Sequence, residues 1–223
     1  MSASTKEPLQ DQLDRITQNT RALVQPERLA ISEKATADLF NTGIEDRILK
    51  TGAKAPAFTL EDALTQKPVS SADLLALGPL VVNFFRGRWD PYCVTELEAW
   101  RDHYQEIRSR GALLVAISPQ TTRQSDFAIQ QHALPFPLLR DERCALAEKF
   151  GIAYTVSPAQ QRQYTNTLVN IPFINGESSW RLPLPATFVI AQNGIISYAN
   201  ASADFRQRPE PEDILSALPA PRR

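Results

Sequence analysis

Residues 79–93 read PLVVNFFRGRWDPYC, an apolar run followed by a charged loop and then a cysteine. The run over 80–85 is typical of a buried strand. Asp90 is a favourable helix N-cap, and Pro91 suits the first position of a helix. The sequence therefore predicts a strand that ends just before the loop and a helix that begins at Pro91, with Cys93 in its first turn.

The position of Cys93 favours a reactive thiol. The first turn of a helix lies at the positive end of its dipole, and Arg86 and Arg88 are close in sequence, so both effects favour the thiolate, which is the reactive form. Asp90 opposes them, because a neighbouring carboxylate raises a thiol pKa unless one of the arginines pairs with it. Spacing alone leaves an alternative open. Cys93 also begins an apolar helical stripe, and it could be a small core residue of that stripe.

The rest of the chain alternates between strand-like and helix-like segments from about residue 52. Strands are expected at 58–60, 80–85, 113–118 and 136–139, helices at 70–77, 91–108, 121–132, 144–150 and 210–218, and a hairpin at 186–199 around an Asn-Gly turn. This order indicates an α/β domain whose parallel strands are covered on both faces, with antiparallel strands added by the hairpin. Ligands gather at the carboxyl ends of strands in such sheets, and Cys93 follows one of these ends.

Two further segments are expected to be wholly or partly helical. Residues 1–48 are expected to form an N-terminal helical extension of two helices separated at Gln25-Pro26, with docking or dimerisation as its role, and 49–223 the α/β domain. The insert at 154–180 is expected to be partly helical, and either a lid over the site or a dimer contact.

Composition excludes several classes of function. The 223 residues carry a net charge of −1, which does not favour a nucleic-acid or membrane-surface partner. No apolar stretch approaches the roughly 18 residues that span a bilayer, and the polar start lacks a signal core, so we expect a cytoplasmic protein. Two cysteines and two histidines make a structural zinc site improbable, and we expect neither a metal nor a cofactor.

Several segments carry a resemblance to a known family. They are KAPAFTL at 54–60, VNFF at 82–85 with CVTE at 93–96, AIS at 116–118, PLLRD at 137–141 with AEKFG at 147–151, and PATFVI at 185–190. In this order they resemble the peroxiredoxin (alkyl hydroperoxide reductase C/thiol-specific antioxidant) family of the thioredoxin superfamily, over about three quarters of the chain. Residues 85–93 also resemble a bacterial peroxiredoxin-like branch with the motif Arg-Gly-x-Trp-Cys-Pro-Tyr-Cys.

The resemblance implies a thioredoxin-like fold, with a central mixed sheet flanked by helices, and a thiol peroxidase activity. Cys93 would attack a peroxide and become a sulfenic acid, which a thioredoxin- or glutathione-type thiol would reduce. A homodimer is a further expectation. Two alternatives stay open: a redox-inactive thioredoxin-fold binding protein and a monothiol disulfide oxidoreductase.

The chain departs from the family pattern near the reactive cysteine. The family's proline seven positions before the cysteine is Arg86 here. Its threonine three positions before, which is a cysteine in the narrower branch, is Asp90. The family's late arginine falls at Pro185, which becomes a candidate cis-proline facing Cys93.

The resemblance also suggests roles for the remaining site residues. Because Pro185 replaces the family's arginine, Arg86 or Arg88 is expected to polarise the peroxide. Glu96 matches a family glutamate, and it either orients an arginine near the cysteine or is an exposed helix residue without a function. Cys144 begins another predicted helix, where it either resolves the sulfenic acid or packs in the core.

Overall fold

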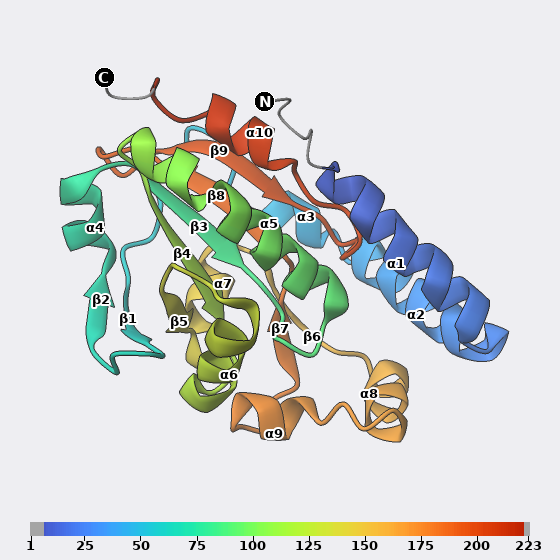
Figure 1. Ribbon diagram of the computed structural model, residues 1–223. Helices are drawn as coiled ribbons and strands as arrows, with labels where there is room; N and C mark the ends of the chain where they lie inside the picture. Colours follow the sequence, from blue (N-terminus) through green and yellow to red (C-terminus); the bar gives the residue numbers. More distant parts are fainter. Residues whose placement is uncertain (1–6, 221–223) are drawn as a thin grey trace.

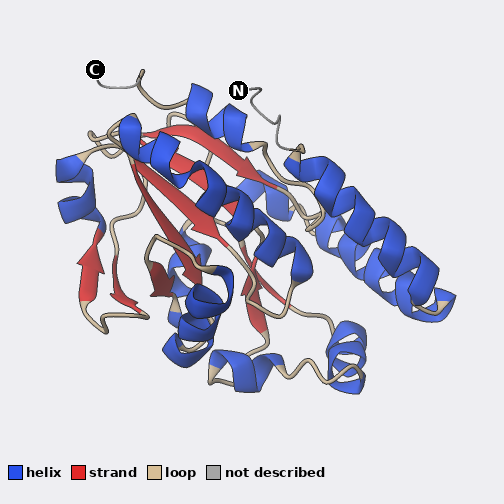
Figure 2. Cartoon of the chain, in the orientation of Figure 1, coloured by secondary structure: helices blue, strands red, loops and turns tan. Residues whose placement is uncertain are grey.

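A computed structural model describes residues 7–220, which form a seven-stranded mixed sheet with helices on both faces (Figures 1 and 2). The sheet order is β2-β1-β5-β4-β3-β8-β9. β3 (Leu80–Phe84), β4 (Leu113–Ser118) and β5 (Leu138–Arg140) run parallel. The hairpin of β8 (Ala186–Ile190) and β9 (Ile196–Ala201) adds antiparallel strands beside β3. The predicted mixed sheet and its hairpin are confirmed.

Short strands extend this framework. β1 (Thr59–Asp62) pairs antiparallel with both β5 and β2 (Pro68–Ser70), and α4 (Ser71–Leu77) follows. A separate two-stranded ribbon joins β6 (Ala153–Thr155) to β7 (Arg181–Pro183). The insert runs between these two strands and contains α8 (Pro158–Asn166) and α9 (Ile171–Asn175). β2, β6 and β7 were not predicted from the sequence.

The sheet separates two apolar cores. The α5-face core lies under α5 (Pro91–Ser109), α6 (Thr122–His132) and α10 (Pro211–Ser216), and contains Val81 of β3 and Phe85, which follows β3. The α7-face core lies under α3 (Ile44–Arg47) and α7 (Ala145–Lys149), and takes Val82 and Phe84. Successive residues of β3 enter opposite cores because side chains alternate along a strand. β3 is buried along its whole length, as its continuous apolar run predicts.

The predicted N-terminal extension forms a helical hairpin beside the start of α5 (Figure 1). α1 (Leu9–Leu23) and α2 (Pro26–Asn41) are separated at Gln25-Pro26, as predicted. α1 packs on α5, where Leu9 and Leu13 form a small apolar cluster with Tyr92. α2 lies against α8. The extension therefore packs against α5, which carries Cys93, and against the insert.

Candidate active site

Cys93 lies in the first turn of α5, as predicted. Asp90 is the N-cap of this helix, and its Oδ1 accepts a hydrogen bond from the backbone N–H of Tyr92 at 3.1 Å. The Cys93 side chain is completely buried. Its thiol donates to Asp90 Oδ2 at 2.8 Å, and its sulfur accepts from the backbone N–H of Arg86 at 3.4 Å. The loop between β3 and α5 therefore folds back onto the sulfur.

Asp90 is also the counter-ion of Arg86. The Nε and Nη2 atoms of Arg86 lie 2.8 and 2.7 Å from Asp90 Oδ2, the same oxygen that accepts the thiol proton. Both side chains are buried, with 3% and 1% exposed. Burial of a charged pair costs free energy that only close, well-bonded geometry offsets. The Asp90 carboxylate thus caps the helix, neutralises a buried guanidinium and accepts a hydrogen bond from the thiol.

Arg88, which was predicted as a candidate for peroxide polarisation, lies away from this cluster. Its Nε donates to Gln124 Oε1 at 2.6 Å, and its guanidinium carbon lies 5.5 Å from the ring centre of Phe127. Its backbone N–H donates to Gln120 at 2.9 Å. Glycine at 87 has a φ of +149°, in the region that favours glycine, and the chain turns there between the two arginines. The structure therefore brings Arg86, and not Arg88, to Cys93.

A second arginine reaches Cys93 from the far end of the chain. Arg208, in the loop between β9 and α10, places Nη2 3.8 Å from the Cys93 sulfur. Its Nε donates to Glu96 Oε2 at 2.8 Å, and both side chains are buried. Glu96 Oε1 in turn accepts from Asn83 on β3 at 2.9 Å. Glu96 therefore contacts an arginine beside Cys93 and is not an exposed helix residue. Arg208 was not predicted as its partner, because no local signal connects positions 96 and 208.

The structure corrects the expected ionisation of Cys93. The pKa of this thiol is raised from 9.0 to about 12, mainly by burial and next by the Asp90 carboxylate. Arg208 and Arg86 lower it, but they do not outweigh the first two causes. The prediction of a thiolate at neutral pH is therefore wrong for this arrangement. Cys93 is a thiol whose proton already lies on a hydrogen bond to a carboxylate.

Two other candidates do not join the cluster. Cys144 is buried in the α7-face core, whereas Cys93 belongs to the α5-face core, so the sheet lies between the two sulfurs. Pro185 precedes β8, but no peptide bond within residues 7–220 is cis, so the expectation of a cis-proline is wrong. The role of Cys144 as a resolving thiol stays a prediction to which the geometry lends no support.

Aromatic side chains surround the Arg86 guanidinium. Its carbon lies 4.1 Å from the ring centre of Phe205 and 5.2 Å from that of Trp89. Trp89 contacts Tyr164 of α8 edge to face, with ring centres 5.2 Å apart. Burial raises the pKa of Tyr154, and the charge of Arg86 opposes that rise. The insert and the β9–α10 loop thus help to enclose Arg86.

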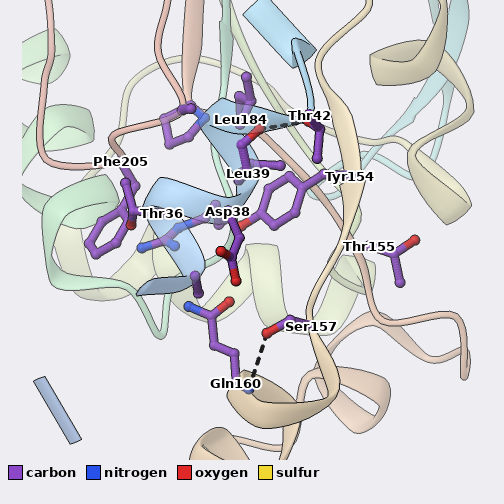
Figure 3. Close-up of a pocket in the computed structure, with 14 residues that line it drawn as sticks. Thr36, Asp38, Leu39, Thr42, Tyr154, Thr155, Ser157, Gln160, Leu184 and Phe205 are labelled. Carbon is purple, nitrogen blue, oxygen red and sulfur yellow. Dashed lines mark hydrogen bonds between the residues drawn. The ribbon is translucent and has the colours of Figure 1, made fainter. Parts of the chain in front are cut away.

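A cleft of about 150 Å³ opens beside this cluster (Figure 3). Its walls come from α2, from the start of the insert and from the β9–α10 loop. They include Thr36, Leu39, Tyr154, Gln160, Leu184 and Phe205. Arg86 also faces the cleft, whereas Cys93 does not line it. Arg86 therefore stands between the cleft and the buried thiol.

The fold and the site together define a thioredoxin-like protein with a buried thiol at the start of a helix. The family model described as AhpC/TSA family matches residues 51–199, more than half of the chain. The chain therefore belongs to the AhpC/TSA family, the peroxiredoxin group of the thioredoxin superfamily.

Individual relatives agree with this assignment. The chain is 31% identical over 117 residues to the chloroplastic peroxiredoxin Q of Sedum lineare, covering 52% of this chain and 61% of the relative. It is 33% identical over 104 residues to the putative peroxiredoxin bcp of Haemophilus influenzae, covering 47% of this chain and 66% of the relative. The chain spans about half to two thirds of the length of the curated relatives it matches.

Solved structures support the fold. Peroxidoxin BcpB of Mycobacterium tuberculosis superposes with a TM-score of 0.59 at 24% identity, over 76% of this chain and 96% of that one. Reduced Prx3 of Vibrio vulnificus, solved in complex with hydrogen peroxide, gives a TM-score of 0.59 at 17% identity, over 77% and 99% of the two chains. At these identities the likeness establishes a common fold.

Proposed function

We propose that this protein is a thiol-dependent peroxidase that reduces hydrogen peroxide or an organic hydroperoxide through a sulfenic acid on Cys93. One observation carries the proposal. The Cys93 thiol lies in a buried polar cluster, donating to Asp90 at 2.8 Å with the Arg208 guanidinium 3.8 Å from its sulfur. The family membership and the peroxiredoxin names of the relatives agree with this chemistry.

The reaction begins with proton transfer from the thiol to Asp90. As the Cys93 sulfur attacks one peroxide oxygen, an S–O bond forms and the O–O bond breaks. The thiol proton passes to Asp90 Oδ2 and then to the departing oxygen, which leaves as water or an alcohol. Cys93 is oxidised to a sulfenic acid, the peroxide is reduced, and the Asp90 carboxylate is regenerated.

The arginines assist in different ways. Arg208 lies close enough to stabilise negative charge on the sulfur and on the peroxide oxygens as the O–O bond breaks. Arg86 holds Asp90 Oδ2 in place through two contacts, and its backbone N–H points at the sulfur. Glu96 fixes the position of Arg208. Together these groups supply preorganised positive charge where the reaction needs it.

An external thiol, of the thioredoxin or glutathione type, would return Cys93 to its reduced state. The first thiol attacks the sulfenic sulfur and releases water, and a second thiol then breaks the resulting mixed disulfide. An external reductant is favoured because Cys144 lies in the core on the other face of the sheet. No helix within residues 7–220 has the length and apolarity to cross a bilayer. The cytoplasmic location and the homodimer stay predictions.

The test compares the wild type with Cys93→Ser, using hydrogen peroxide and cumene hydroperoxide as oxidants. We expect the wild type to consume peroxide when a reductant is present, and its Cys93 peptide to gain the mass of one oxygen atom or to be trapped by dimedone. Cys93→Ser should do neither, while Cys144→Ser should behave as the wild type. If the wild type does not consume peroxide and its Cys93 stays unmodified, the proposal is refuted.

A further inference from the structure

Helix α2 provides one wall of the cleft beside Arg86. It contributes Ala35, Thr36 and Leu39 to the lining, although it lies outside the residues that the family model matches. None of its described residues is fully buried, although Leu39 packs against the α7-face core. α2 therefore lines the cleft with side chains that are only partly covered by the rest of the protein.

The opposite walls are mostly apolar. Tyr154, Leu184 and Phe205 face α2 across the cleft, and Gln160 and Ser157 lie at the edge formed by α8 (Figure 3). A volume of about 150 Å³ is close to that of an apolar cavity that holds one benzene-sized group. Hydrogen peroxide, which is close to water in size, does not require such a space.

The lining favours a neutral ligand. The two charged residues in it, Arg86 and Asp38, both have partners: Arg86 bonds Asp90, and Asp38 accepts from Lys34 at 2.8 Å. An anionic substrate would find no unpaired cation among these lining groups. An apolar group of modest size fits the walls better.

The inner end of the cleft leads to the reactive cluster. Arg86 faces the cleft, and the same guanidinium bonds Asp90, which accepts the Cys93 proton. Phe205 lies over this guanidinium and also lines the cleft. Arg86 therefore connects the cleft to the Asp90–Cys93 pair.

We propose that this cleft binds the organic group of a neutral, compact hydroperoxide, and that α2 makes the N-terminal extension part of the substrate site. The proposal rests on the peroxidase activity proposed above. The peroxide oxygens point toward Arg86, which keeps its contacts with Asp90, and the side chain of Phe205 shifts to admit them, because Cys93 exposes no surface in this arrangement. Hydrogen peroxide gains nothing from the apolar walls.

The test uses cumene hydroperoxide, whose phenyl ring matches the volume of the cleft, and hydrogen peroxide as its small counterpart. Ala35→Phe fills the cleft from α2, while Ala37→Phe adds the same ring to an exposed position of the same helix outside the lining. We expect Ala35→Phe to lower the rate constant for cumene hydroperoxide about tenfold more than that for hydrogen peroxide, because the added ring removes the space that the organic group needs. Ala37→Phe should change neither. Equal effects on both peroxides, or none on cumene hydroperoxide, would overturn the proposal.

A binding measurement covers the case in which Ala35→Phe does not fold. The alcohol product, 2-phenyl-2-propanol, is titrated into the Cys93→Ser protein and backbone amide shifts are followed by NMR. Shifts grouped at 35–42, 154–157 and 203–205 support the subsite, and their absence contradicts it. This readout needs no turnover. If neither peroxide oxidises the wild type, the peroxidase activity is refuted, and the binding test of the cleft still stands.

Discussion

Replacing Asp90 with asparagine separates two ways in which Cys93 could react. The substitution keeps the size of the side chain and the oxygen that caps α5, but it removes the carboxylate that accepts the thiol at 2.8 Å. If Asp90 takes the proton during attack, the variant loses its base. If instead only a small population of free thiolate reacts, the variant loses a group that raises the thiol pKa.

The two mechanisms predict changes of opposite sign. With a thiol pKa of about 12, the thiolate is about 10⁻⁵ of the protein at pH 7. A return to the ordinary value of 9.0 would raise that fraction about 1,000-fold. Asp90 is the second cause of the shift after burial, so its removal restores only part of this factor. Loss of a general base, in contrast, slows a reaction by about 10² to 10⁴. We expect Asp90→Asn to slow the oxidation of Cys93 at least about 100-fold.

Stopped-flow oxidation by hydrogen peroxide at pH 7 measures this rate, with Asp73→Asn as a control in the exposed first turn of α4. An Asp90→Asn variant that reacts faster than the wild type would refute the role of Asp90 as base. The variant also leaves Arg86 buried without a counter-ion, which costs about 3–5 kcal/mol of stability. Asp90→Asn combined with Arg86→Met removes both charges, and it should be slow as well.

Three other results are expected. Arg208→Met should lower the free energy of unfolding in urea by about 3–5 kcal/mol, because Glu96 is left buried without its ion-pair partner. Adding Glu96→Gln should restore most of that free energy, but oxidation of Cys93 should stay about 100-fold slower than in the wild type. Full recovery of the rate would exclude the role of Arg208. Because the pKa of Cys93 is raised in the folded protein, the thiol of the unfolded chain ionises first as pH rises. The free energy of unfolding should therefore fall between pH 9 and 12 by about 1.4 kcal/mol per pH unit relative to that of Cys93→Ser. A parallel pH dependence of the two proteins would contradict the raised pKa. Oxidised protein should contain no Cys93–Cys144 disulfide in non-reducing peptide mapping; finding one would show that the sheet opens during turnover.

Local signals explain why much of the fold was predictable. The start of α5 is encoded by an N-cap and a proline in adjacent positions, and the β8–β9 hairpin by an Asn-Gly turn. Strands β2, β6 and β7 have three residues each, which is too short for an alternation to be recognised. They exist because neighbouring strands supply their hydrogen bonds.

The site, too, contains residues placed by local sequence signals and a residue placed only by tertiary packing. Cys93, Asp90 and Arg86 lie within eight consecutive positions, so a turn and a helix start suffice to bring them together. Arg208 arrives through the packing of the β9–α10 loop, which no local pattern encodes. The ionisation of Cys93 was wrongly predicted for a related reason. Dipole and sequence neighbours can be read from the chain, whereas burial depends on tertiary contacts from both ends of it.

The charge balance of the buried cluster explains why Cys93 keeps its proton and how its sulfur can still react. Asp90 and Glu96 carry two negative charges, and Arg86 and Arg208 carry two positive charges, so the cluster is neutral while Cys93 holds its proton. Loss of that proton to solvent would leave a net negative charge in a buried site, which burial penalises. Transfer of the proton to Asp90 keeps the cluster neutral and still forms a thiolate beside Arg208. The thiol can therefore be activated inside the protein at a pH where almost none of it would ionise into water.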